Sequence, residues 1–290
     1  MIQQIFSIVF PVFAIVLAGF LYGRKHLPDM AAANKINLDI FTPALIFSVL
    51  SGKSFDVTEF SSLAAGAAFI VLMSGIMAWP VARMMGWNVK TFVPPVMFTN
   101  SGNMGLPLAL FAFGEAALPA AVLLFIIENG LHFTVGMKMM DRKASLLEIF
   151  RLPMLIATFA GLAVSVSDIE IPSVIATPIE MIGQIAIPLM LFSLGVRLLS
   201  IDYSDWRIGV TAAIVTPVSG LLLAIVYLSV IEMPEDQVAL FFLFAALPPA
   251  VLNFIVAEKF NQEPARVASI VMMGNLASIV VIPVVLAVVL

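Results

Sequence analysis

Long apolar stretches without Asp, Glu, Lys or Arg recur along the whole chain. A helix needs roughly 20 apolar residues to cross the hydrocarbon core of a bilayer. Six uncharged stretches reach that length, at 1–23, 60–82, 91–114, 208–231, 237–257 and 267–290. Four more are shorter or interrupted by charged residues, at about 34–52, 116–137, 152–167 and 173–196. The pattern predicts an all-α membrane protein with ten transmembrane helices and short connections, forming one domain over 1–290.

The positions of the basic residues orient these ten spans. Of the 14 Lys and Arg, all except Lys53 fall in the connections on one side, and Arg197 is among them. Because basic residues mark the cytoplasmic side, we expect both termini to be non-cytoplasmic, and we expect a bacterial inner membrane. Arg24 and Lys25 follow the first apolar run, whereas a signal peptide carries its positive charge before the run. Residues 1–23 are therefore expected to be a span.

Composition supports a membrane location and excludes several kinds of chemistry. The chain is 62% hydrophobic and 11% charged, whereas soluble domains carry about 25% charged residues. It contains no cysteine, which excludes disulfides, thiolate catalysis and cysteine metal sites. We see no basic patch for nucleic acid, and we expect no metal and no cofactor.

Short motifs relate the two halves of the chain. PVFAIVLAGF and PMLIATFAGL begin at Pro11 and Pro153, and PALIFSVL and PLMLFSLG begin at Pro43 and Pro188. These matches pair Gly19 with Gly161 and Phe47 with Phe192, and Asn129 and Asn275 continue the pattern at a similar shift. Because each half holds an odd number of helices, the second half enters the membrane from the opposite side. We therefore predict two inverted five-helix repeats, over about 1–140 and 148–290.

The fourth and ninth spans, 91–114 and 237–257, are each interrupted by helix-breaking residues. One contains NSGNMGLP from Asn100, and the other contains LPPAVLN from Leu247. Proline removes a backbone N–H and clashes with the preceding turn, and the freed polar groups must avoid lipid. The N-termini of half-helices at such breaks suit a carboxylate or another anion. The alternative is a structural kink with small residues for close packing.

The sequences NSGNMGLPL and ALPPAVLNFIVAEKFN resemble the auxin efflux carrier family, which includes plant PIN proteins and bacterial malonate-transporter-like members. The resemblance covers the whole chain in length, span count and topology, although the long cytosolic loop of the larger plant members is missing. It implies a fold related to bile acid/sodium symporters, in which the fourth and ninth helices cross at mid-membrane and an organic anion binds beside the crossing. The candidate substrate-binding residues are Asn100, Ser101, Asn103, Gly105, Pro107, Pro248, Pro249 and Asn253.

The sequence thus predicts a secondary transporter that moves a small organic anion, a mono- or dicarboxylate, by alternating access. An anion channel is the main alternative, and an intramembrane enzyme is a weaker one, because the chain has only two histidines and no nucleophile motif. We expect Asn103→Ala and Asn253→Ala each to weaken binding while folding stays intact.

Three polar residues are candidates for coupling transport to H⁺ or Na⁺. Glu128 and His132 are four residues apart, on one helix face, and a carboxylate beside an imidazole suits a coupling proton. A structural hydrogen-bonded pair is the alternative. Glu180 is the third candidate, for ion or substrate binding. Small residues over 43–48 and 188–193 allow close helix approach, so we also expect a homodimer.

Overall fold

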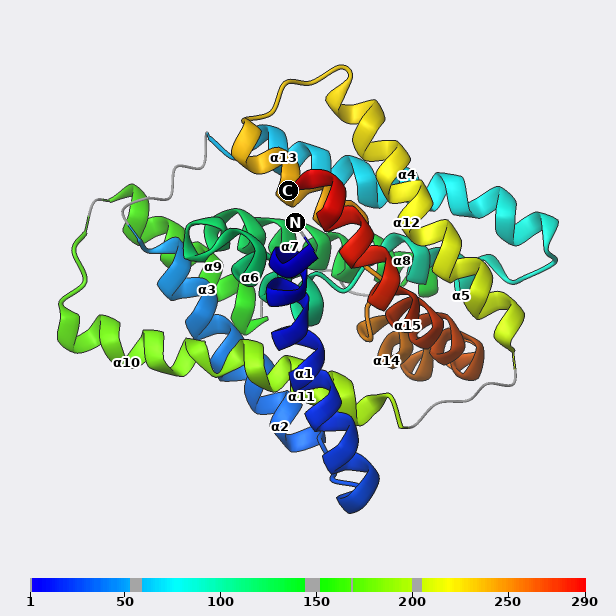
Figure 1. The fold of residues 1–290 in the computed structure, drawn as a ribbon, viewed down its shortest axis with the longest axis horizontal. Helices are drawn as coiled ribbons and strands as arrows, with labels where there is room; N and C mark the ends of the chain where they lie inside the picture. The colour runs from blue at the N-terminus through cyan, green and yellow to red at the C-terminus, as the bar shows by residue number, and fades with distance from the viewer. Residues whose placement is uncertain (1, 53–58, 144–151, 168, 200–204) are drawn as a thin grey trace.

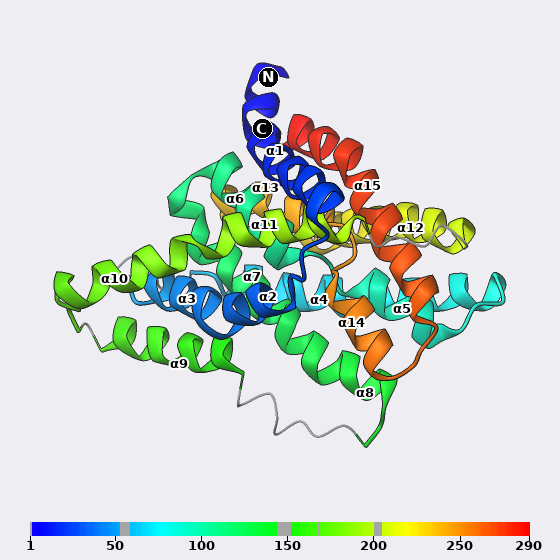
Figure 2. The same ribbon diagram turned by 90° about the horizontal axis from the view of Figure 1, so that it is seen from below.

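The computed structural model describes residues 2–52, 59–143, 152–167, 169–199 and 205–290. Within these ranges all regular elements are helical, apart from one isolated antiparallel bridge between Thr99 and Pro249. Elements from distant parts of the chain are interleaved, and the two termini lie close together in both views (Figures 1 and 2).

The helices of the first half have the following bounds, where η1, η2 and η4 are π-helical turns and η3 is a 3₁₀ turn: α1 (Ile2–His26), α2 (Ala31–Ile36), η1 (Asn37–Phe41), α3 (Thr42–Leu50), α4 (Ser61–Met84), α5 (Val89–Met97), η2 (Ser101–Gly105), α6 (Leu106–Phe113), η3 (Glu115–Ala117), α7 (Leu118–Leu131), η4 (His132–Gly136) and α8 (Met137–Met140). Those of the second half are α9 (Pro153–Val166), α10 (Ser173–Gln184), α11 (Ala186–Arg197), α12 (Trp206–Leu228), α13 (Glu235–Ala245), α14 (Leu252–Lys259) and α15 (Pro264–Val289).

Several of these helices are long and apolar enough to cross a bilayer. Among the described residues there are 6, and shorter apolar helices cover Ser101–Phe113 and Pro153–Val166. The long ones are Gln3–His26, Ser61–Met84, Glu115–Met140, Ser173–Arg197, Trp206–Leu228 and Pro264–Val289. These helices confirm the prediction of an integral, multi-pass, all-helical protein.

The outer surface has the character expected of a protein in lipid. Phe6, Phe10, Leu17 and Leu21 are more than half exposed, and their spacing places them along one face of α1. Soluble monomers rarely expose an apolar stripe of this length. We therefore assign this face of α1 to the hydrocarbon region.

The helices form two groups that meet at the centre of the molecule. The first group joins α1 to α11, and α3 to α9 and α10. The second group packs α4 against α5, α7 and α12, and α12 against α15. In Figures 1 and 2, α3, α9 and α10 lie on the side of the molecule opposite α5 and α12. The broken segments between α5 and α6, and between α13 and α14, belong to the second group.

Prolines widen two helices rather than ending them. The π-helical turns η1 and η2 come directly before the first turns of α3 and α6, which contain Pro43 and Pro107. Proline cannot donate to the carbonyl four residues back and its ring crowds that carbonyl, and a wider π turn relieves this conflict. The prediction that Pro107 takes part in the break was therefore wrong: the chain leaves helical geometry at Phe98–Asn100, and Pro107 lies in the first turn of α6.

Candidate functional site

The two broken segments cross as short extended strands that hydrogen-bond to each other. The Asn100 backbone N–H donates to the Pro248 carbonyl at 2.7 Å, and the Ala250 N–H donates to the Phe98 carbonyl at 3.0 Å. Pro248 and Pro249 have no N–H, so the pairing cannot extend into a longer ladder. The crossing thus satisfies, inside the protein, polar backbone groups that lipid would leave unpaired.

Three buried asparagines lie at this crossing and hold its backbone in place. The Asn253 amide donates to the Phe98 and Ala250 carbonyls at 2.8 and 3.0 Å. The Asn100 amide donates to Asn275 Oδ1 at 3.0 Å, and the Asn275 amide donates to the Pro249 carbonyl at 3.1 Å. Asn275, on α15, is the sequence equivalent of Asn129 in the first half, but it was not predicted as a site residue.

A cavity of about 230 Å³ lies beside the crossing, between the two helix groups. One wall is formed by Asn100, Ser101 and Asn103, which the sequence predicted, and by Glu128 and His132. Among the described residues the Asn103 side chain forms no hydrogen bond, so its amide is available to a ligand. The opposite wall comes from the first helix group and includes Asn34, Asn37, Asp39, Pro153, Ser193 and Arg197.

Glu128 and His132 both reach this cavity, but they have different partners. Each is only 2% exposed. The Ser101 hydroxyl donates to the Glu128 carboxyl group, and the backbone of Thr99 and Ser101 also hydrogen-bonds it. The His132 ring stacks on Phe98, with centroids 4.2 Å apart and planes 3° apart. In the described part of the chain no hydrogen bond joins Glu128 to His132, so the structural pair considered from sequence does not form.

Other predicted residues shape the crossing without lining the main cavity. A Cβ on Gly105 would lie 3.0 Å from Leu247 Cδ1, so this glycine lets η2 pack close to the second broken segment. Pro249 packs against Gly274, where a Cβ would lie 2.3 Å from Pro249 Cδ. Pro107, Pro248, Pro249 and Asn253 are likewise absent from the cavity wall.

Glu180 lies apart from the crossing. It is exposed and lines a separate cavity of about 490 Å³ together with Glu115, Gln184 and Ser48. The two cavities share no lining residue. The structure therefore does not bring Glu180 together with Glu128 and His132.

Arg197 is the main site residue that the sequence analysis missed. Its position at the end of an apolar run placed it in a cytoplasmic connection, whereas it is the last residue of α11 and lines the cavity. Ser193 lines the same cavity, and its hydroxyl donates to Asn34 Oδ1 at 2.5 Å. The four-residue spacing from Ser193 to Arg197 puts both on one helix face. That spacing was the signal in the sequence from which Arg197 could have been predicted as a site residue.

The lining of this cavity consists of polar side chains around a break in two membrane helices, an arrangement that is typical of a transporter. A family model described as "Membrane transport protein" matches residues 4–286. The chain belongs to this family. The match confirms the resemblance to the auxin efflux carriers.

Two relatives align with this chain over nearly its whole length. A protein of Rhizobium meliloti (strain 1021) named "Putative malonate transporter" is 24% identical over 302 residues, covering 95% of this chain and 93% of the relative. An uncharacterized transporter of Methanocaldococcus jannaschii is 22% identical over 302 residues, covering 95% of this chain and 96% of the relative. The family and these relatives are transporters, so this member of the membrane transport protein family is a transporter and not an enzyme.

Proposed function

We propose that this chain is a secondary carrier that moves a small carboxylate across the membrane by alternating access. The observation that carries the proposal is the cavity beside the helix crossing, where the Asn103 amide and the first turn of η2 provide uncharged donors. The first N–H groups of a helix have no intrahelical partner and favour an anion. The cavity volume of about 230 Å³ leaves room for several water molecules, and therefore for a small organic acid.

The glycine contacts support the inverted repeat. A Cβ on Gly19 would lie 2.1 Å from the Phe192 carbonyl oxygen, and one on Gly161 would lie 3.3 Å from the Phe47 carbonyl oxygen. Sequence matching pairs Gly19 with Gly161 and Phe47 with Phe192. Gly19 of the first half therefore packs against Phe192 of the second half, and their sequence equivalents, Gly161 and Phe47, pack against each other in the same way. A two-fold relation between two inverted five-helix repeats requires such equivalent contacts.

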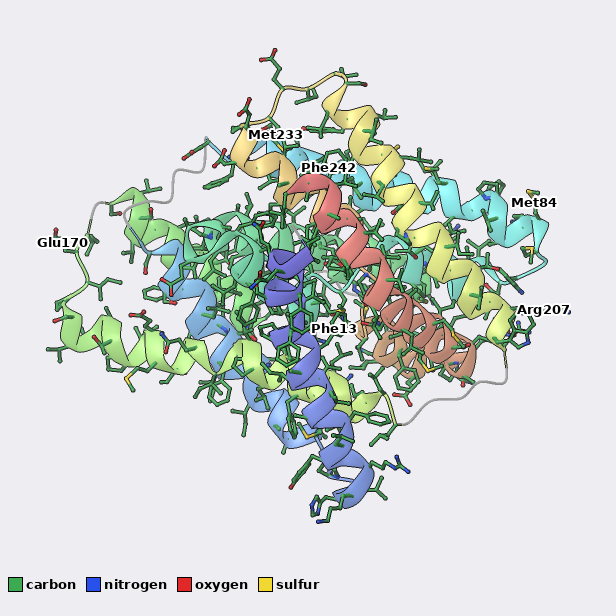
Figure 3. All side chains as sticks on the ribbon, in the orientation of Figure 1. Phe13, Met84, Glu170, Arg207, Met233 and Phe242 are labelled. Carbon is green, nitrogen blue, oxygen red and sulfur yellow. The ribbon has the colours of Figure 1, made fainter. Side chains whose placement is uncertain are left out.

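The placement of charged ends supports the proposed topology, with non-cytoplasmic termini. Arg207 and Met84, which follows Arg83, lie at one end of the molecule, while Glu170 lies at the opposite end (Figure 3). Lys53, the single basic residue on the predicted outer side, lies outside the described residues. Under the positive-inside rule, the end with Arg207 faces the cytoplasm, and we propose a bacterial inner membrane.

The two cavities suggest which state of the carrier is represented. The crossing cavity includes Asn34, Pro153 and Arg197, which lie at helix ends assigned to the cytoplasmic side. The other cavity includes Ser51 and Glu115, at ends assigned to the outside. The crossing residues line the cavity on the cytoplasmic side, and the two cavities share no residue. We therefore assign the structure to an inward-facing state in which the crossing is reached from the cytoplasm.

Glu128 is the proposed coupling residue, with H⁺ as the coupling ion. Its carboxyl group already occupies the start of η2 through Ser101, where a substrate carboxylate would bind. Two negative charges 4 Å apart repel by about 4 kcal/mol at an effective dielectric constant of 20. A proton on Glu128 would remove this repulsion and free the donors, so anion and proton would bind together.

The homodimer remains a proposal, and the helix faces behind it are used inside one subunit. Leu45 packs against Gly183, and Phe47 packs against Gly161. An interface would therefore have to use another face. A monomeric mass, measured both in mild detergent and in native membranes, would contradict the dimer.

A binding screen tests the proposed function. Purified protein would be titrated with organic anions, including malonate, at two pH values and with or without Na⁺. The proposal predicts saturable binding of a small carboxylate that strengthens at the lower pH and does not need Na⁺. Absence of binding for every carboxylate would contradict it. A Na⁺ requirement would keep the carrier but replace the proton as coupling ion.

A further inference from the structure

Arg197 lines two cavities. Besides the crossing cavity, it lines a second cavity of about 220 Å³ between α11, α14 and α15. Val251, which directly precedes α14, and Ile255, within α14, line both cavities as well. The guanidinium group carries five N–H donors and stays charged, so it can serve a ligand on one side and a protein carboxylate on the other.

Glu258 provides that protein carboxylate. It lies in the last turn of α14 and lines the second cavity together with Arg197, near enough for its negative charge to act on the guanidinium group. Glu258 is exposed to solvent, so water and salt screen its attraction to Arg197, and replacing it with another anion costs little. The pair also connects the two helix groups, since α11 packs on α1 while α14 packs on α15.

The two walls of the crossing cavity differ in charge. At the crossing, the donors that face the cavity are uncharged. Among the described residues that line this cavity, Arg197 is the one Lys or Arg side chain. Asp39, on the same wall, is paired with Lys35 at 3.3 Å. A ligand with two carboxylates would therefore meet neutral donors on one wall and a fixed cation on the other.

We propose that Arg197 binds the second carboxylate of a dicarboxylate whose first carboxylate lies at the crossing, and that Glu258 is a counter-ion of Arg197 in the empty carrier. This inference rests on the proposed function and narrows its substrate class. A dicarboxylate replaces Glu258 as the partner of Arg197, whereas a monocarboxylate leaves the pair in place. Arg197 thus selects substrates with two negative charges.

The test compares malonate with monomethyl malonate, which keeps one charge, in binding titrations of the purified protein in nanodiscs. Wild type should bind malonate more tightly than the ester. Arg197→Gln should weaken malonate binding by roughly 10- to 150-fold, the range for one charge-assisted hydrogen bond. It should change binding of the ester by less than about twofold.

Three further variants sharpen the test. Arg197→Lys keeps the charge but not the paired donors, so malonate affinity should fall between wild type and Arg197→Gln. Glu258→Gln removes the competing carboxylate and should strengthen malonate binding by about 1.5- to 5-fold. Lys259→Gln removes an exposed neighbouring charge that lines neither cavity, and it should leave both affinities unchanged.

The possible failures separate the two proposals. Unchanged malonate affinity in Arg197→Gln, or equal loss of both ligands, would overturn the role of Arg197 and leave the carrier proposal standing. A wild type without preference for malonate would do the same. If wild type binds no carboxylate at all, the proposed function itself fails.

Discussion

The same substitution at Asn103 and Asn253 should have different consequences, because the two amides have different surroundings. Asn253→Ala removes donors from the Phe98 and Ala250 carbonyls. Side-chain hydrogen bonds between membrane helices are worth about 0.6 kcal/mol on average and up to about 1.7. Two such losses should lower the free energy of unfolding by about 1–3 kcal/mol. This prediction differs from the expectation from sequence that folding would stay intact.

Asn103→Ala removes an amide that lines the cavity and forms no hydrogen bond among the described residues. Stability should therefore stay near that of wild type. If the amide donates to a substrate carboxylate, the loss is about 1.5–3 kcal/mol, or roughly 10- to 150-fold in affinity.

The two effects can be measured on the same samples. Thermal unfolding followed by tryptophan fluorescence reports stability, and titration with malonate reports affinity. We expect a lower melting temperature only for Asn253→Ala, and a direct loss of affinity for Asn103→Ala. Equal melting temperatures for the two variants would refute the assignment of Asn253 to the support of the crossing. Wild-type affinity in Asn103→Ala would move the ligand away from this wall.

Three further predictions follow from the contacts. Glu128→Gln should keep malonate binding and exchange but lose uptake driven by an inward proton gradient in proteoliposomes; unchanged driven uptake would remove Glu128 from coupling. Gly105→Val should block transport, because a Cβ there already lies 3.0 Å from Leu247 Cδ1, whereas Gly105→Ala should retain transport; equal rates in both would contradict a close approach at this point. A cysteine at Ser173, in a chain without other cysteines, should react with an impermeant maleimide added to intact cells, and reaction only after permeabilisation would invert the topology.

Much of the fold follows from the sequence, because lipid imposes a simple rule on long apolar helices. Runs such as 60–82 and 208–231 match helices Ser61–Met84 and Trp206–Leu228 closely. The break near Pro248 was also predictable, because two adjacent prolines cannot continue a helix. The break in the first half was misplaced toward Pro107, because proline is tolerated in the first turn of a helix.

The site was predicted less completely, because its parts come from distant segments. Sequence shows which residues are polar, but not whether an amide faces a cavity, as Asn103 does, or a carbonyl, as Asn253 does. Glu128 was matched with its near neighbour His132, whereas its hydroxyl partner is Ser101 on another helix. Counting Arg197 as a connection residue concealed that it belongs to α11 and lines the cavity.

The central claim is that this protein is a carrier and not a channel, and counterflow tests it directly. Proteoliposomes loaded with a high concentration of the tightest-binding carboxylate from the screen are diluted into a trace of the radiolabelled compound. A carrier with one alternately exposed site should accumulate the label transiently above its equilibrium level, and Asn103→Ala should reduce this overshoot. Label that enters without any overshoot, at a rate that does not saturate with concentration, would contradict the account.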